Sequence, residues 1–303
     1  MKLPFSENGR TQPDPYIFEY KGKFYLYVTA GTGVEAYTAD TLLGPWSFYG
    51  VVCAIDGCRN YWAPCILRYG EKFYLYFSCE SAAFSEWLHV ASSDSPLGPF
   101  TNAKLLYQRF TIDAHVVETR KGLFLFYAEN NTEPERCGTR VFVDRLLDPE
   151  TPANLCKEVI VPTFDEEIFR RNRLGDGIDW HTIEGPFWFR EGQWQYLMYS
   201  GGCYTNDSYH IGYCAAKSDE EDLTAVDFIK HTDNGRFSPV LIKNDVEEGT
   251  GHHSVIRYNG EYYAIYHGRD YQALQPEGYQ EARTARICRL SVENGIITAQ
   301  PML

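Results

Sequence analysis

A recurrent pattern constrains the fold of this 303-residue chain more than any other feature. The pattern is an apolar strand, a turn centred on glycine, and an aromatic strand that ends in tyrosine. It occurs five times, as YIFEYKGKFYLY (16–27), ILRYGEKFYLY (66–76), VVETRKGLFLFY (116–127), FWFREGQWQYLMY (187–199) and VIRYNGEYYAIY (255–266). Each copy predicts a β-hairpin, because glycine supplies the positive φ that a short turn between two strands requires.

The spacing of the copies predicts the size of the unit that each one begins. The closing tyrosines, at positions 27, 76, 127, 199 and 266, are 49, 51, 72 and 67 residues apart. Such steps suit one four-stranded unit per copy, with loop insertions in the third and fourth. The segments LGPW (43–46) and LGPF (97–100) also recur where outer strands are expected. We therefore predict an all-β fold, a five-bladed β-propeller that forms a single domain over residues 1–303; a β-sandwich is the alternative.

One segment carries a helix signature. In SDEEDLTAVDFIK (218–230), Ser218 is a candidate N-cap, and Glu221 three residues later would complete a capping box. We predict a short peripheral helix there. Little helix is expected elsewhere, since aromatic residues make up 16% of the chain and favour strands.

The charge and hydropathy of the chain argue against two classes of partner. Lysine and arginine number 28 against 41 aspartates and glutamates, and the net charge of −13 would repel a phosphate backbone, so no nucleic-acid partner is expected. No run of about 18 apolar residues predicts a membrane span.

The N-terminal segment lacks the apolar core of a signal peptide, and the nine cysteines form no C-x-x-C pair. We expect a cytoplasmic protein with reduced thiols, and both a monomer and a homo-oligomer stay open.

Polar residues precede the first strand of four copies at nearly the same position. Asp14, Asp113, Glu184 and His252 stand 8, 9, 8 and 8 residues before the turn glycine of their own copies. If these strands are the innermost ones, equivalent positions around the axis bring the four side chains together at one end of a central channel. Crowded carboxylates repel and lose solvation, which raises the pKa of at least one of them.

Carboxylates with separated pKa values are what glycoside hydrolysis needs. One protonates the leaving oxygen while the other activates water or attacks carbon. Taken singly, each residue also has a structural interpretation: Asp14 before a proline as a turn former, Asp113 as a strand cap, and Glu184 as a solvated loop acid. Their shared position favours the catalytic interpretation.

With these residues in place, the chain resembles glycoside hydrolase family 43 from about residue 12 to the C-terminus. The resemblance rests on six motifs in order: Asp14-Pro15, Trp62-Ala63-Pro64, Ile112-Asp113, Glu184-Gly185-Pro186, the Gly-x-Gly-His segment that ends at His252, and Tyr266-His267. It implies a five-bladed propeller and an inverting mechanism. Asp14 would be the general base, Glu184 the general acid, and Asp113 the residue that tunes the acid and holds the sugar. The two working carboxyls of an inverting site lie roughly 6.5 to 9.5 Å apart.

The resemblance implies three further site residues. His252 matches a histidine that often faces a channel metal, commonly calcium; a hydrogen-bonded histidine without metal is the alternative, and the chemistry itself requires no cofactor. Because imidazole is a poor calcium ligand, such an ion would be mostly hydrated. Arg283 matches an arginine beside the substrate, with Arg286 as a competing assignment. Trp62 is a candidate wall against a sugar ring, or else a core residue. His253 is expected on the opposite face of its strand from His252.

These features predict an exo-acting glycosidase. It would release L-arabinofuranose or D-xylose from short oligosaccharides, as an α-L-arabinofuranosidase, a β-xylosidase or both. Larger family members append a β-sandwich that this chain does not contain, so substrate length is open. The alternatives are an endo-acting arabinanase and a non-catalytic propeller that binds carbohydrate. An enzyme acting on fructans or mannosides would be expected to carry an Asn-Asp-Pro-Asn-Gly run, which is missing.

Overall fold

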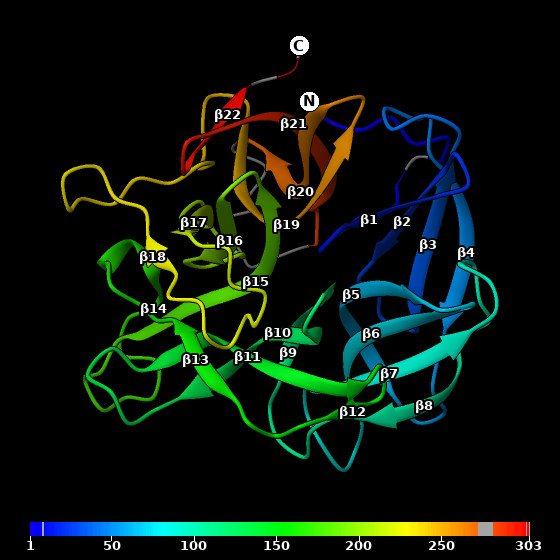
Figure 1. Cartoon of the computed structure of the whole chain (residues 1–303), viewed down its shortest axis with the longest axis horizontal. Helices are drawn as coiled ribbons and strands as arrows, with labels where there is room; N and C mark the ends of the chain where they lie inside the picture. The colour runs from blue at the N-terminus through cyan, green and yellow to red at the C-terminus, as the bar shows by residue number, and fades with distance from the viewer. Residues whose placement is uncertain (8, 272–280, 301, 303) are drawn as a thin grey trace.

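The computed structural model describes residues 1–7, 9–271, 281–300 and 302, and its fold is all-β (Figure 1). The first sheet contains β1 (Tyr16–Tyr20), β2 (Lys23–Val28), β3 (Val34–Ala39) and β4 (Ser47–Cys53). The second contains β5 (Arg59–Tyr69), β6 (Lys72–Glu80), β7 (Trp87–Ser93) and β8 (Thr101–Leu105). The last contains β19 (Glu247–Tyr258), β20 (Glu261–Asp270), β21 (Thr284–Glu293) and β22 (Ile296–Gln300).

The middle of the chain forms a larger sheet from two copies of the repeat. Its first half contains β9 (Ile112–Thr119), β10 (Gly122–Asn131), β11 (Gly138–Asp148), β12 (Thr151–Pro152) and β13 (Lys157–Ile160). Its second half contains β14 (Ile168–Arg170), β15 (Trp180–Glu191), β16 (Trp194–Gly201), β17 (His210–Lys217) and β18 (Ile229–Lys230). A short parallel pairing of β11 with β15 joins the halves, and a single 3₁₀ turn (Asp165–Glu167) precedes β14. The additional short strands occupy the insertions expected in the third and fourth units.

All five predicted hairpins are confirmed. They are the antiparallel pairs β1–β2, β5–β6, β9–β10, β15–β16 and β19–β20. Their turn glycines have positive φ, from 58° at Gly192 to 116° at Gly122. The LGPW and LGPF segments also lie where they were expected, directly before the fourth strands β4 and β8.

The first strands of the five hairpins gather at the middle of the molecule. Strand β1 contacts β5 and β19, β9 contacts β5 and β15, and β15 contacts β19. These contacts run from one hairpin to the next and return to the first, and Figure 1 shows the sheets arranged around this centre. The residues that lead these strands therefore come from distant parts of the chain to one place.

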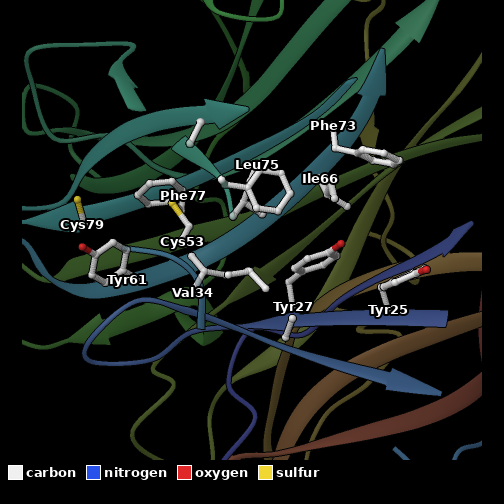
Figure 2. Packing of buried hydrophobic residues seen from close by; sticks show 14 residues of the cluster. Tyr25, Tyr27, Val34, Cys53, Tyr61, Ile66, Phe73, Leu75, Phe77 and Cys79 are labelled. Carbon is white, nitrogen blue, oxygen red and sulfur yellow. The ribbon is translucent and has the colours of Figure 1, made fainter. Parts of the chain in front are cut away.

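The core lies between neighbouring sheets. One cluster joins the first two sheets, with Tyr27, Val34, Leu75 and Phe77 fully buried at its centre (Figure 2). Aromatic rings and β-branched side chains from facing strands fill this space, which accounts for the aromatic composition. The remaining interfaces have equivalent clusters.

The helix predicted over residues 218–230 is wrong. The segment is a turn and irregular chain that leads into β18. The side chains of Arg190 and Gln195 both donate to the carbonyl oxygens of Ser218 and Glu220. In a helix, those carbonyls would instead accept bonds from amides four residues later. Tertiary hydrogen bonds therefore override the local capping signal.

Two further observations concern the whole chain. Where the structure describes the chain, no helix has the length and apolar character to cross a bilayer. All nine cysteines are free thiols, and Cys156 is the exposed one.

Candidate active site

A backbone irregularity accompanies the first strand of each hairpin, just before β1 and within β5, β9, β15 and β19. Asp14, Ala63, Asp113, Gly185 and His252 all have positive φ, between 43° and 63°. In β5, β9, β15 and β19 this residue lies at a β-bulge, where the pairing register with the following strand shifts. A bulge re-aims the side chain at the end of a strand. Non-glycine residues in this conformation are strained, which is common at functional sites.

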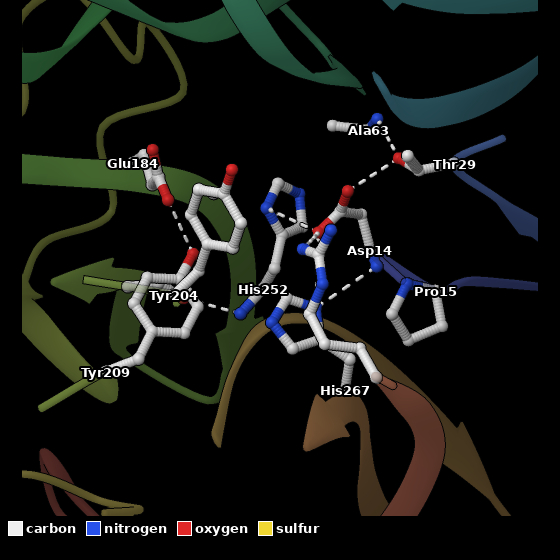
Figure 3. A network of polar contacts seen from close by, with 12 residues as sticks. Asp14, Pro15, Thr29, Ala63, Glu184, Tyr204, Tyr209, His252 and His267 are labelled. Atoms are coloured by element: carbon white, nitrogen blue, oxygen red, sulfur yellow. Dashed lines mark hydrogen bonds and ion pairs between the residues drawn. The ribbon is translucent and has the colours of Figure 1, made fainter. Parts of the chain in front are cut away.

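The structure brings the predicted site residues to one pocket of about 240 Å³. Its lining includes all six of them: Asp14, Trp62, Asp113, Glu184, His252 and Arg283. Glu184 lies one residue before the positive-φ position, which Gly185 occupies, so its position differs slightly from those of Asp14, Asp113 and His252. Figure 3 shows the carboxyl groups of Asp14 and Glu184 on different sides of His252.

Asp14 is held by a dense set of contacts. Its Oδ1 lies 3.1 Å from the guanidinium of Arg283, and its Oδ2 accepts a hydrogen bond from Thr29 Oγ1 at 2.5 Å. Thr29 Oγ1 in turn accepts the backbone N–H of Ala63 at 2.8 Å, which ties the first sheet to the second. Burial alone would raise the pKa of Asp14, but the Arg283 guanidinium holds it well below its usual value. Asp14 is therefore an ionised carboxylate.

The two candidate arginines differ in their position relative to the pocket. Arg286 pairs with Glu247 at 3.2 Å and with Asp270 at 2.5 Å, away from the pocket. Arg283 faces the pocket instead, with its guanidinium 4.7 Å from the ring centre of Tyr204.

Glu184 has the opposite electrostatic environment. No ion pair reaches its carboxyl from the described residues, and Oε1 accepts a hydrogen bond of 2.6 Å from Tyr209. Its enclosure in the pocket raises the pKa of Glu184 to about 7, despite the opposing effect of the Tyr209 hydroxyl. Near neutral pH this carboxyl carries a proton for much of the time.

Asp113 is the third of the predicted carboxyl groups in the pocket. It is buried, and its Oδ2 accepts the backbone N–H of Gly185 at 2.9 Å, directly after Glu184 in the chain. Burial, followed by the neighbouring charges of Glu184 and Asp14, raises the pKa of Asp113 well above its usual value. Asp14, Asp113 and Glu184 therefore do not all carry a negative charge at once.

The histidines of the pocket are neutral. His252 Nδ1 lies 3.6 Å from Asp14 Oδ1 and 3.8 Å from Asp113 Oδ2, and burial lowers its pKa. His267 Nδ1 lies 3.1 Å from the backbone nitrogen of Asp14 and 3.1 Å from its Oδ1. Burial lowers the pKa of His267 to about 4. His253 is buried separately, 6.2 Å from the ring of Phe187.

The residues around His252 do not fit a calcium ion held by protein ligands. Among the described residues, no group of three or more histidines, cysteines, aspartates or glutamates is arranged to hold a metal ion. Calcium takes six to eight oxygen ligands, and the imidazole offers nitrogen. Calcium near His252 stays a prediction.

Several pocket residues were not predicted from the sequence. Tyr204 and Tyr209 come from the β16–β17 connection, and Glu86 comes from the β6–β7 connection. Thr29, which directly follows β2, contacts Asp14 from the adjoining pocket. None belongs to the repeated hairpin, so the repeat carries no signal for them. His267 was part of a recognised motif, but its contact with Asp14 was not foreseen.

The chain is similar in sequence to proteins of one family. Residues 54–297 match the family model described as glycosyl hydrolases family 43. A probable arabinan endo-1,5-alpha-L-arabinosidase C of Aspergillus clavatus is 33% identical over 110 residues, which cover 34% of this chain and 31% of that relative. A probable arabinan endo-1,5-alpha-L-arabinosidase A of Aspergillus flavus is 21% identical over 258 residues, which cover 78% of this chain and 75% of that relative.

Solved structures share the fold over nearly the whole chain. A thermostable family-43 glycoside hydrolase superposes with a TM-score of 0.80 at 27% identity, covering 98% of this chain and 95% of that one. An alpha-L-arabinofuranosidase from Lactobacillus brevis superposes with a TM-score of 0.74 at 20% identity, covering 95% and 93%. The family match spans well over half of the sequence and includes Asp113, Glu184 and His252. The chain therefore belongs to glycosyl hydrolases family 43.

Proposed function

We propose that this family 43 enzyme is an inverting glycosidase that releases L-arabinofuranose or D-xylose from short oligosaccharides of arabinan or hemicellulose. One observation carries the proposal: a single pocket holds an ionised carboxylate, Asp14, and a carboxyl that is protonated near neutral pH, Glu184. This is the pairing of base and acid that single-displacement hydrolysis requires.

The proposed reaction has one chemical step. Asp14 accepts a proton from a water molecule as the water oxygen attacks the anomeric carbon. The bond between that carbon and the glycosidic oxygen breaks, and the departing oxygen takes the proton of Glu184. Afterwards Asp14 carries a proton and Glu184 a negative charge, and exchange with solvent restores both groups. Arg283 keeps Asp14 ionised between turnovers.

Asp113 and Trp62 have supporting roles in this proposal. Asp113 anchors the backbone next to Glu184 and holds a sugar hydroxyl, which a neutral carboxyl can do as a donor. Trp62 is half-buried on the pocket wall, where its ring can pack on the C–H face of a sugar.

We also infer that the architecture is a five-bladed β-propeller. The support is the circuit of contacts among β1, β5, β9, β15 and β19, each of which leads a hairpin. Each blade would begin with one of these strands, and the pocket would lie at one end of their shared axis.

The function can be tested with four variants. Asp14→Asn should abolish hydrolysis of every substrate, and Glu184→Gln should lower kcat/KM on oligosaccharides by about 10²–10⁴-fold. Asp40→Asn and Glu71→Gln, whose side chains are 94% and 97% exposed, are the matched controls and should keep wild-type rates. The substrates are nitrophenyl α-L-arabinofuranoside, β-D-xyloside and galactofuranoside, followed by arabinan and xylan oligosaccharides. Wild-type rates in both pocket variants would remove these residues from the chemistry, and carbohydrate binding without turnover would favour a non-catalytic propeller.

An endo-acting arabinanase is the second candidate. A further pocket of about 310 Å³ adjoins the first across Trp62, Tyr204 and Arg283, so substrate could extend past the reacting sugar. The products of linear arabino-oligosaccharides distinguish the two modes. Exo action gives monosaccharide from the first time point, whereas endo action gives a mixture of shorter oligosaccharides. Proton NMR of the first-formed anomer tests inversion.

A further inference from the structure

The side chain of Tyr209 is buried and closely packed at the pocket. Its side chain is 1% exposed, and its ring stacks on His267 with 5.5 Å between ring centres and 7° between planes. Gly251 lies directly against the ring, where a Cβ would come within 2.0 Å of a ring carbon. The ring is therefore seated in a slot that only glycine leaves open.

The slot aims the Tyr209 hydroxyl at one oxygen of Glu184. The hydroxyl donates to Oε1 at 2.6 Å (Figure 3). Burial, followed by the charge of Glu184, raises the pKa of Tyr209 well above its usual value, so the hydroxyl keeps its hydrogen. An oxygen that accepts this bond is not the one that carries the acid proton, which leaves Oε2 for that role.

The same stack reaches the opposite side of the pocket. His267, which covers the Tyr209 ring, accepts the backbone N–H of Asp14. Tyr209 and His267 thus form a continuous contact between the residue that donates a proton and the residue that accepts one. A shift of the tyrosine ring would have to displace the strand end that carries Asp14.

Resting on the proposed function, we propose that Tyr209 is a positioning residue that occupies Oε1 of Glu184 and so directs the proton on Oε2 toward the departing oxygen. Gly251 and His267 seat its ring. Tyr209→Phe removes the hydroxyl and keeps the ring.

The effect of Tyr209→Phe should depend on the leaving group. Hydrolysis of an oligosaccharide needs a proton on the departing oxygen, whereas dinitrophenolate departs without one. We expect kcat to fall about 10–100-fold on an arabino- or xylo-oligosaccharide and less than about threefold on the dinitrophenyl glycoside. Equal losses on both substrates would overturn the proposal, because a general structural disturbance does not distinguish leaving groups.

A second readout is the titration of Glu184 itself. A hydroxyl that donates to a carboxylate favours the charged form, so its removal should raise the pKa of Glu184 further. We expect the basic limb of the kcat/KM profile to move up by about one pH unit. Carbon-13 NMR of labelled glutamate, with the Glu184 signal identified by its loss in Glu184→Gln, should show the same shift. An unchanged Glu184 titration would overturn the proposal.

Tyr107→Phe is the matched control. Tyr107 is equally buried, and its hydroxyl donates to Asp144 at 2.9 Å outside the pocket. It should leave the leaving-group dependence and the Glu184 titration unchanged. The NMR titration needs no substrate: if the wild-type protein hydrolyses no glycoside, the proposed function fails, while a shifted Glu184 signal in Tyr209→Phe would still support the positioning contact.

Discussion

Two enclosed carboxyls, Asp14 and Glu184, take opposite protonation states because of single neighbouring residues. Arg283 lies 3.1 Å from Asp14 and favours its charge. Among the described residues, Glu184 accepts a hydrogen bond from the Tyr209 hydroxyl, which does not offset the loss of solvation that raises its pKa. Burial opposes the charge of both residues, so the partner of each one decides its protonation state.

The raised pKa of Glu184 predicts a pH-dependent cost in stability. Its pKa rises from an ordinary value of 4.5 to about 7 in the folded state, so the folded protein binds this proton more tightly than the unfolded chain. The resulting stability is fully present below about pH 4.5 and is lost as the pH rises through 7. Glu184→Gln lacks this dependence. Between pH 5 and 8, we expect the free energy of unfolding of the wild type to fall by up to about 2–3 kcal/mol more than that of Glu184→Gln.

Urea unfolding at the two pH values measures this difference. Glu71→Gln, an exposed substitution of the same kind, should follow wild type. Parallel losses in wild type and Glu184→Gln would show that Glu184 does not change its protonation on folding.

At the scale of elements, the hairpins supply the core and the bulges in their first strands supply the pocket. The hairpin buries aromatic and β-branched residues between neighbouring sheets. The bulges in β9 and β19 turn Asp113 and His252 out of the regular alternation and into the pocket. The packing of each hairpin offsets the backbone strain at its positive-φ residue.

Phe77→Ala tests the packing between the first two sheets. Phe77 is fully buried in β6, with its ring 5.5 Å from that of Tyr61 (Figure 2). The substitution should lower the free energy of unfolding by about 3–5 kcal/mol, through lost burial and the cavity left behind. Tyr49→Ala, at a strand position 55% exposed, should cost less than about 1 kcal/mol. Equal urea midpoints for the two variants would contradict this assignment of the core.

At the scale of the whole molecule, the N-terminal segment connects the first and last sheets. Leu3 donates its backbone N–H to Ala285 in β21, and Trp46, next to β4, donates to the carbonyl of Pro4. Leu3 is also 3% exposed, within the core cluster that joins these sheets. The segment therefore links parts of the chain that lie nearly 240 residues apart.

Leu3→Ala should weaken this link between the sheets. We expect a loss of about 2–4 kcal/mol in unfolding free energy, measured by urea denaturation. Lys2→Ala is the control, because the ion pair between Lys2 and Asp270 is exposed and contributes little to the free energy of unfolding. If Leu3→Ala unfolds with the wild-type midpoint, the segment does not help to hold the sheets together.

Much of the candidate site followed from the repeat. Asp14, Asp113 and His252 hold equivalent positions because each begins a hairpin, and a hairpin is a local structure that adjacent residues specify. Glu184 was also identified from its distance to the turn glycine of its own copy, whereas Trp62 and Arg283 came from the resemblance to family 43. The helix at 218–230 failed because Arg190 and Gln195 take its carbonyls, which no local pattern records.

The sequence by itself determined the all-β class, the five hairpins and the residues at their heads, since these depend on short-range periodicity and turn glycines. Only the tertiary structure decided that Arg283 faces Asp14, that the Tyr209 hydroxyl reaches Glu184, and that the Tyr209 ring stacks on His267. Those facts depend on distances between segments far apart in the chain. Electrostatic and packing energies are set by such distances, and sequence order does not specify them.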